Sequence, residues 1–174
     1  MKRIVFIAIF LCSALCAFSQ TSLPSGYRGI TLGMTLDQVK SALLRDAEFG
    51  YRGDRDVSML PDGDRNLIET KGNGYLADCW FQFTEGKLYT ITININTARM
   101  DYYSVFSTLC DKYGNPGELT PERCSWNGSS VIMTLEKPLC IKYMDVNLSS
   151  QLADKAQTEA ASEEKARKDF LDSL

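Results

Sequence analysis

The sequence predicts an α+β protein in which two α-β-β-β units form one antiparallel sheet with helices on one face. Two observations predict this class: each of two amphipathic helices precedes a group of strand-like segments, and apolar and polar residues alternate over 87–95. The units occupy about residues 30–96 and 97–148 and share a pattern rather than residue identities. A charged C-terminal helix over 149–174 is expected to follow the domain 20–148.

Residues 1–19 have the order of a secretory signal peptide. Lys2 and Arg3 precede an apolar run, and the small segment Ala17-Phe18-Ser19 follows it. The run is shorter than the about 20 apolar residues that span a bilayer. We therefore expect an exported protein, periplasmic or secreted, with no transmembrane span after cleavage.

A lipid anchor is the alternative outcome of export. It would require Cys12 or Cys16 to follow the small residue of a lipobox, and Leu11 and Leu15 stand there instead. Plain cleavage is therefore favoured over an anchor at Cys16, which would attach the protein to the outer membrane.

The first predicted helix begins at a capping box. Thr35 and Gln38 have the spacing at which each side chain bonds the backbone N–H of the other residue. Leu36, Val39 and Leu43 then share one apolar face. Every residue of this segment has a role in folding, so a structural interpretation is favoured over a catalytic one. Strands are expected behind it at 67–70, 75–83 and 87–95, with turns at 71–74 and 85–86.

The second predicted helix, residues 101–113, repeats this arrangement. Gly114 and Pro116 supply its C-terminal stop. Its apolar face consists of Tyr102, Val105, Phe106, Leu109 and Tyr113. Strands are expected at 123–126, 130–136 and 139–146, separated by the Asn127-Gly128 turn and the Lys137-Pro138 break.

Charge and composition exclude several functions. The chain has no histidine, which excludes Ser-His-Asp, Cys-His and His-ligated metal chemistry. Loss of Lys2 and Arg3 with the leader changes the formal charge from −3 to −5, which argues against a nucleic-acid surface. Carboxylate, lysine, tyrosine and isolated cysteine mechanisms stay open, so an enzyme is the third hypothesis. No acid–base pair can be nominated from spacing, and we therefore predict a protein that is not an enzyme and that holds no cofactor or metal.

Short motifs in the chain resemble known families. Gly33-Met34-Thr35-Leu36-Asp37-Gln38-Val39 followed by Leu43 resembles the opening of the BamE-like (SmpA/OmlA) outer-membrane assembly lipoproteins. The repeated α-β-β-β unit resembles the tandem fold of the β-lactamase-inhibitor proteins, and residues 101–114 and 135–145 are similar to exported spirochaete proteins. The resemblance implies a non-enzymatic envelope module that binds another protein, or a scaffold within a membrane-associated complex.

The loop 51–66 contains two weaker candidates. Arg52-Gly53-Asp54 is the tripeptide that integrins recognise, although turn chemistry alone also favours Gly and Asp in a surface loop. A second group loosely resembles a calcium loop, but Leu67 replaces the required glycine and Arg65 adds a positive charge. That group consists of Asp62, Asp64, Asn66 and Glu69.

Cysteines and tryptophans leave alternatives open. Six cysteines less Cys12 and Cys16 leave Cys79, Cys110, Cys124 and Cys140. Strands flanking 130–136 would hold Cys124 and Cys140 about 9.6 Å apart, beyond the ~7 Å Cα limit of a disulfide. A Cys79–Cys110 bridge from helix to sheet is possible, and buried free thiols are the simpler alternative. Trp80 and Trp126 either complete the core or mark a partner surface.

The segment 149–174 is predicted to be a helix that is exposed in its middle. Glu163 and Arg167, and Glu164 and Lys168, form supportive i,i+4 pairs. An apolar stripe begins with Leu148, Leu152 and Ala156, another closes the chain with Phe170, Leu171 and Leu174, and little between them can be buried. It is either a solvated tail or a docking helix for a partner groove.

Together these observations favour an exported, non-catalytic protein-binding or scaffold module of the bacterial cell envelope. The alternative is a secreted adhesin or enzyme inhibitor acting on host or competitor proteins, which Arg52-Gly53-Asp54 and the inhibitor-like fold favour. Carriage of a lipid or small ligand between helices and sheet is a further hypothesis.

Overall fold

The computed structural model describes residues 22–59 and 65–174. The expected signal peptide, with Cys12 and Cys16, lies outside these residues, as do Asp62 and Asp64 of the calcium hypothesis. The described chain is an α+β protein with one large antiparallel sheet, as the sequence predicts. A separate two-stranded sheet pairs β1 (Gly26–Tyr27) with β2 (Ile30–Thr31).

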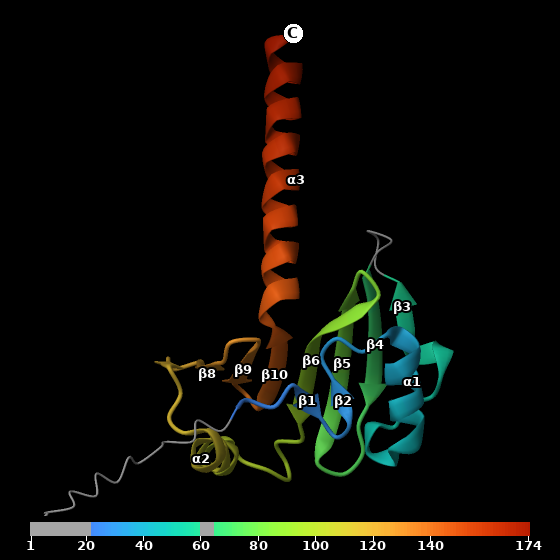
Figure 1. Ribbon diagram of the computed structural model, residues 1–174, viewed down its shortest axis with the longest axis vertical. Helices are drawn as coiled ribbons and strands as arrows, with labels where there is room; N and C mark the ends of the chain where they lie inside the picture. The colour runs from blue at the N-terminus through green and yellow to red at the C-terminus, as the bar shows by residue number, and fades with distance from the viewer. Residues whose placement is uncertain (1–21, 60–64) are drawn as a thin grey trace, which may run out of the picture.

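The large sheet has eight strands in the order β3-β4-β5-β6-β10-β9-β8-β7 (Figure 1). Its first half runs from an edge strand to the middle of the sheet: β3 (Val57–Met59), β4 (Arg65–Lys71), β5 (Leu76–Thr84) and β6 (Lys87–Ile95). Its second half is β7 (Glu118–Leu119), β8 (Arg123–Asn127), β9 (Val131–Glu136) and β10 (Cys140–Asp145).

Two α-β-β-β units therefore share this sheet. Helix α1 (Leu36–Arg45) precedes β4, β5 and β6, and α2 (Tyr102–Tyr113) precedes β8, β9 and β10. The last strands of the two units pair with each other, because β6 and β10 are antiparallel neighbours. The short strands β3 and β7 extend the two edges, and the 3-10 turns η1 (Ala47–Phe49) and η2 (Asp54–Asp56) follow α1.

Both helices pack on the same face of the sheet. Val39 and Leu43 of α1 and Leu109 of α2 belong to one buried cluster, together with alternate residues of the central strands such as Phe81 and Ile141. The capping box is present: Thr35 N–H donates to Gln38 Oε1 at 2.9 Å, and Gln38 N–H donates to Thr35 Oγ1 at 3.4 Å. The opposite face of the sheet carries the polar residues of the alternation and is called the open face below.

A β-bulge changes the predicted alternation at the start of β6. Leu88 pairs with Phe83, and the next pair is Thr90 with Gln82, so Tyr89 is the inserted residue. The sequence predicts that Tyr89 shares a face with Ile91. The structure instead places Tyr89 beside Thr90 on the open face, because the inserted residue shifts the period by one.

Helix α3 (Val146–Asp172) continues directly from β10 and projects beyond the sheet (Figure 1). Asp145 caps it by accepting a bond from Leu148 N–H at 2.9 Å. It begins three residues before the predicted 149, and all its residues after Leu152 are exposed. Over the described residues, no helix has both the length and the apolar character needed to cross a membrane.

Candidate functional site

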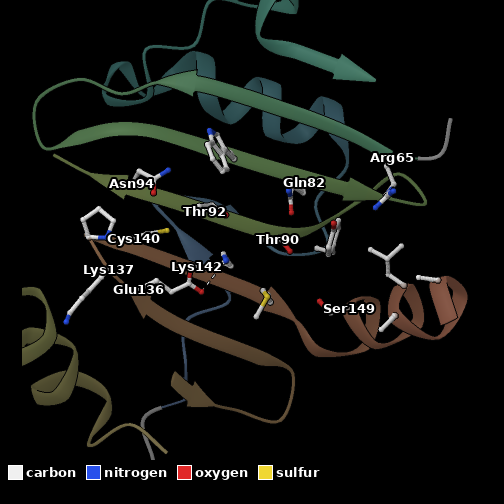
Figure 2. A pocket seen from close by; sticks show the side chains of 17 residues that line it. Arg65, Gln82, Thr90, Thr92, Asn94, Glu136, Lys137, Cys140, Lys142 and Ser149 are labelled. Carbon is white, nitrogen blue, oxygen red and sulfur yellow. Dashed lines mark hydrogen bonds and ion pairs between the residues drawn. The ribbon is translucent and has the colours of Figure 1, made fainter. Parts of the chain in front are cut away.

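The open face carries a groove of about 690 Å³, called the open-face groove below (Figure 2). Its floor consists of residues from β5, β6 and β10. The turn between β9 and β10 borders one side, and the first turns of α3 border another. The first turns of α3 therefore border the face of the sheet that α1 and α2 do not cover, and the rest of α3 projects beyond it.

The floor of the groove consists of polar side chains that are packed or hydrogen-bonded within the sheet. Thr90 and Thr92 of β6 are 4% and 5% exposed, so their side chains are packed within the sheet surface. Asn94 lies further along the same strand, where its Nδ2 donates to Asp78 Oδ1 at 2.6 Å. This row of short polar side chains provides hydrogen-bonding groups at fixed positions.

Larger side chains form an apolar rim. Trp80 of β5 is 39% exposed and lies in the groove, as do Tyr89 and Met144. Leu152 of α3 lines the groove from the helix side. An exposed tryptophan beside apolar side chains is typical of the energetic centre of a protein interface.

The groove is more basic than the protein as a whole. Lys142 Nζ lies 3.2 Å from both carboxylate oxygens of Glu136, and Thr134 Oγ1 lies 3.2 Å from Glu136 Oε1. Arg65 and Lys137 also line the groove. The chain as a whole has a formal charge of −3. More cationic than acidic side chains therefore line the groove.

Two small side chains in the groove bear on its chemistry. Burial raises the pKa of the Cys140 thiol to about 11, and Glu136 adds to this effect while Lys142 opposes it. The thiol is therefore protonated at neutral pH and is a poor nucleophile. Ser149 Oγ is buried without a hydrogen-bond partner among the described residues.

The structure separates the two tryptophans that the sequence offered as binding residues. Trp126 is 3% exposed, lies against Phe106 of α2, and donates its Nε1–H to Gly114 O at 2.7 Å. It belongs to the core on the helix-covered face, whereas Trp80 lies on the open face. Only Trp80 is placed to meet a partner in the groove.

Arg52, Gly53 and Asp54 lie outside the groove, next to α1. Arg52 Nε donates to Asp56 Oδ1 at 2.9 Å, and its backbone N–H donates to Asp56 Oδ2 at 2.8 Å. Asp54 is 89% exposed, with Lys40 Nζ 2.8 Å from its Oδ1. Gly53 has φ +88°, a conformation that favours glycine. The tripeptide is exposed, but both charged side chains have partners within the protein.

The Cys79–Cys110 bridge is not present. The four cysteines among the described residues, Cys79, Cys110, Cys124 and Cys140, are free thiols. The bridge is absent because α2 packs on the second unit, where Tyr102 Oη lies 3.6 Å from Cys124 Sγ, whereas Cys79 is on β5 of the first unit. Burial raises the pKa of Cys79 to about 12.

Asn66 and Glu69 of the calcium hypothesis lie on β4. The described part of the chain has no group of three or more His, Cys, Asp or Glu residues placed to hold a metal ion.

Sequence reasoning missed several groove residues. The alternation in 87–95 indicated a polar face, which contains Thr90, Thr92 and Asn94. Nothing in the local pattern placed Tyr89 there, and nothing indicated that α3 would border this face. The sequence placed Glu136 and Lys142 on two predicted strands, but it did not indicate that their side chains pair in the groove.

Comparison with known proteins identifies a family for the chain. No curated protein and no solved structure matches it. A family model, the TP0088 domain, matches residues 25–155, which include the whole sheet, both packed helices and most of the part of α3 that borders the groove. This is a Treponema-type domain family, which points to a spirochaete protein, as residues 101–114 and 135–145 indicate. The chain belongs to the TP0088 domain family.

Proposed function

We propose that this protein is an exported, non-catalytic protein-binding or scaffold module of the bacterial cell envelope. The observation that carries the proposal is Trp80, an exposed tryptophan within the open-face groove. Tyr89 and Met144 lie in the same groove, so an apolar partner segment would contact several large side chains at once. The leader-like residues 1–19 and the BamE-like motif Gly33–Val39 support an envelope location.

The chemistry of the groove defines the partner segment. A polypeptide with apolar side chains would contact the rim, and acidic groups on it would be attracted to Lys137. The backbone of such a segment would find hydrogen-bonding groups in the less buried Gln82 and Asn94 of the floor. These features favour a protein partner with an exposed amphipathic segment.

Site-specific photo-crosslinking tests this proposal. A photoreactive amino acid replaces Trp80 in the exported protein within its own cells, and the matched control places the same group at Tyr103, which is 75% exposed on α2. We expect position 80, but not position 103, to capture one envelope protein in stoichiometric yield. Equal capture at both positions, or none at position 80, would refute the proposal.

The secreted adhesin remains the second candidate, because Asp54 is 89% exposed on its loop. Asp54→Glu keeps the charge but lengthens the side chain, which integrin-type recognition does not tolerate. Loss of host-cell binding in this variant would favour the adhesin over the envelope module. Unchanged binding would remove that role from Arg52, Gly53 and Asp54.

A further inference from the structure

We propose that the open-face groove binds an extended segment of the partner protein, about four or five residues long, that lies along β6, and that it does not admit a helix. The inference rests on the proposed function, since it names the form of the polypeptide that the groove would bind. Its basis is the register of β5, β6 and β10 and the size of the side chains that these strands present on the open face.

Strand β6 provides a floor of short side chains between two strands with longer ones. Thr90 and Thr92 are the short residues in the middle of β6. The residues paired with them are longer, namely Trp80 and Gln82 on β5 and Lys142 and Met144 on β10. All six line the open-face groove, so a trough one strand wide, called the β6 trough below, runs along β6 (Figure 2).

The width of the β6 trough selects an extended chain. The backbones of β5 and β10 are separated by two inter-strand spacings, about 9.6 Å. An α-helix with its side chains is about 10–12 Å across, whereas neighbouring extended chains lie only about 4.8 Å apart. The long side chains of β5 and β10 narrow the space further. An extended chain can therefore reach the floor at Thr90 and Thr92, and a helix cannot.

Both ends of the β6 trough are bounded. The first turns of α3 border the end at Thr90, because Met144, the partner of Thr90, lies just before α3. The turn that contains Lys137 borders the other end, at Asn94. The stretch of β6 from Thr90 to Asn94 spans about 14 Å at about 3.4 Å per residue, which matches about four or five extended residues.

The two ends of the β6 trough differ in chemistry. Tyr89, Met144 and Leu152 gather at the end beside α3, and Trp80 lies midway along the trough. Lys137 is exposed at the other end. Apolar side chains of the bound segment therefore fit beside α3 and Trp80, and an acidic side chain fits beside Lys137. The occupant is a short extended segment that is apolar at one end and acidic at the other.

Peptide selection on the purified exported protein tests the form of the occupant. One displayed library contains short linear peptides, and a second presents randomised residues on the surface of a helical scaffold. We expect the linear library to yield peptides that combine apolar residues with an acidic one and that lose binding to Trp80→Ala. Helical binders that depend on Trp80, or a linear library without binders, would overturn the proposal.

Filling the β6 trough tests where a selected linear peptide lies. Thr92→Leu raises the floor and should weaken its binding by about tenfold or more, whereas Thr92→Val keeps the side-chain volume and should retain binding. Thr134→Leu is the matched control, because Thr134 lies on β9 outside the groove lining and is 4% exposed, against 5% for Thr92. Equal weakening by the two leucine variants, or unchanged binding to Thr92→Leu, would contradict this placement. Trp80→Ala, at a 39% exposed position, repeats the test without altering a packed side chain.

Charge reversal tests the acidic end of the segment. Lys137→Glu should weaken binding of the same peptide, and the loss should be smaller at high salt. Lys112→Glu makes the same change on an exposed residue of α2 and should leave binding unchanged. Equal binding to both variants would contradict the position assigned to the acidic side chain.

The proposed function and this inference can fail separately. Capture of an envelope protein at position 80, together with Trp80-dependent binders from the helical library, would support the proposed function and overturn the extended form. Linear peptides in the β6 trough with no envelope partner at position 80 would do the reverse.

Discussion

Asp56 is a buried carboxylate whose side-chain hydrogen bonds, over the described residues, all come from Arg52. Arg52 donates to it from the backbone N–H, from Nε and from the terminal guanidinium, and Asp56 is 4% exposed. Burial alone raises the pKa of this carboxyl, but the hydrogen bonds from Arg52 outweigh it, so the pKa of Asp56 lies below its ordinary value. The pair fixes the loop that contains Gly53 and Asp54.

The lowered pKa of Asp56 predicts a pH-dependent contribution to stability. A carboxyl whose pKa is lower in the folded protein stabilises it above the unfolded value near 3.8, and this stabilisation is lost as pH falls through the folded pKa. We expect Asp56→Asn to lower the free energy of unfolding by about 1–3 kcal/mol at pH 7, and the difference to shrink below about pH 4. Urea unfolding at both pH values measures it.

The exposed Asp54 supplies the control for this prediction. Asp54→Asn changes the same chemical group at 89% exposure and should leave the free energy of unfolding nearly unchanged. A constant difference between Asp56→Asn and the unmodified protein across the acid range would contradict the assigned pKa.

The different burial of the two tryptophans predicts their fluorescence. The chain has two tryptophans, so Trp126→Phe leaves only Trp80 and Trp80→Phe leaves only Trp126. Acrylamide should quench the 39% exposed Trp80 strongly and the 3% exposed Trp126 weakly. Stronger quenching in Trp80→Phe than in Trp126→Phe would mean that the open face is not the accessible one.

At the scale of elements, local sequence determines how the helices begin. Thr35 caps α1 through the capping box, Asp101 accepts from Ser104 N–H at 2.9 Å at the start of α2, and Asp145 caps α3. Each cap satisfies backbone N–H groups that have no partner within the helix. These contacts lie within four residues of each other, which explains why the capping box was predictable.

The capping box predicts the effect of a single substitution. Thr35→Ala removes the acceptor for Gln38 N–H and should lower the free energy of unfolding by about 0.5–2 kcal/mol. Thr35→Ser retains a hydroxyl and is the matched control, with a smaller loss expected. Chemical denaturation followed by circular dichroism measures both, and equal losses would assign the effect to the methyl group instead.

At the scale of the molecule, the two units are joined through β6 and β10. Ile91 pairs with Tyr143 and Ile93 with Ile141 across this seam, and all four are buried in one continuous cluster. Because the core crosses the seam without a break, we expect the two units to unfold together rather than one after the other.

Shortening one buried side chain between β6 and β10 tests whether the two units unfold together. Ile93 is 1% exposed, so Ile93→Ala should lower the free energy of unfolding by about 2–5 kcal/mol. Fluorescence and circular dichroism should still report one coincident transition. Ile132→Ala, at a half-buried position of β9, is the control and should cost less. Two separated transitions would show that the units fold independently.

Local sequence patterns were sufficient to predict the α+β class, the two α-β-β-β units, the capping box and the charged C-terminal helix. These features depend on residues close together in the chain, where helical and strand periods are visible. Four features became known only from the packed fold: the bulge places Tyr89 on the open face, α2 packs away from Cys79, Trp126 is buried, and α3 borders the groove. Each of these depends on which distant strand or helix lies alongside, and burial of apolar surface across the whole chain selects that arrangement.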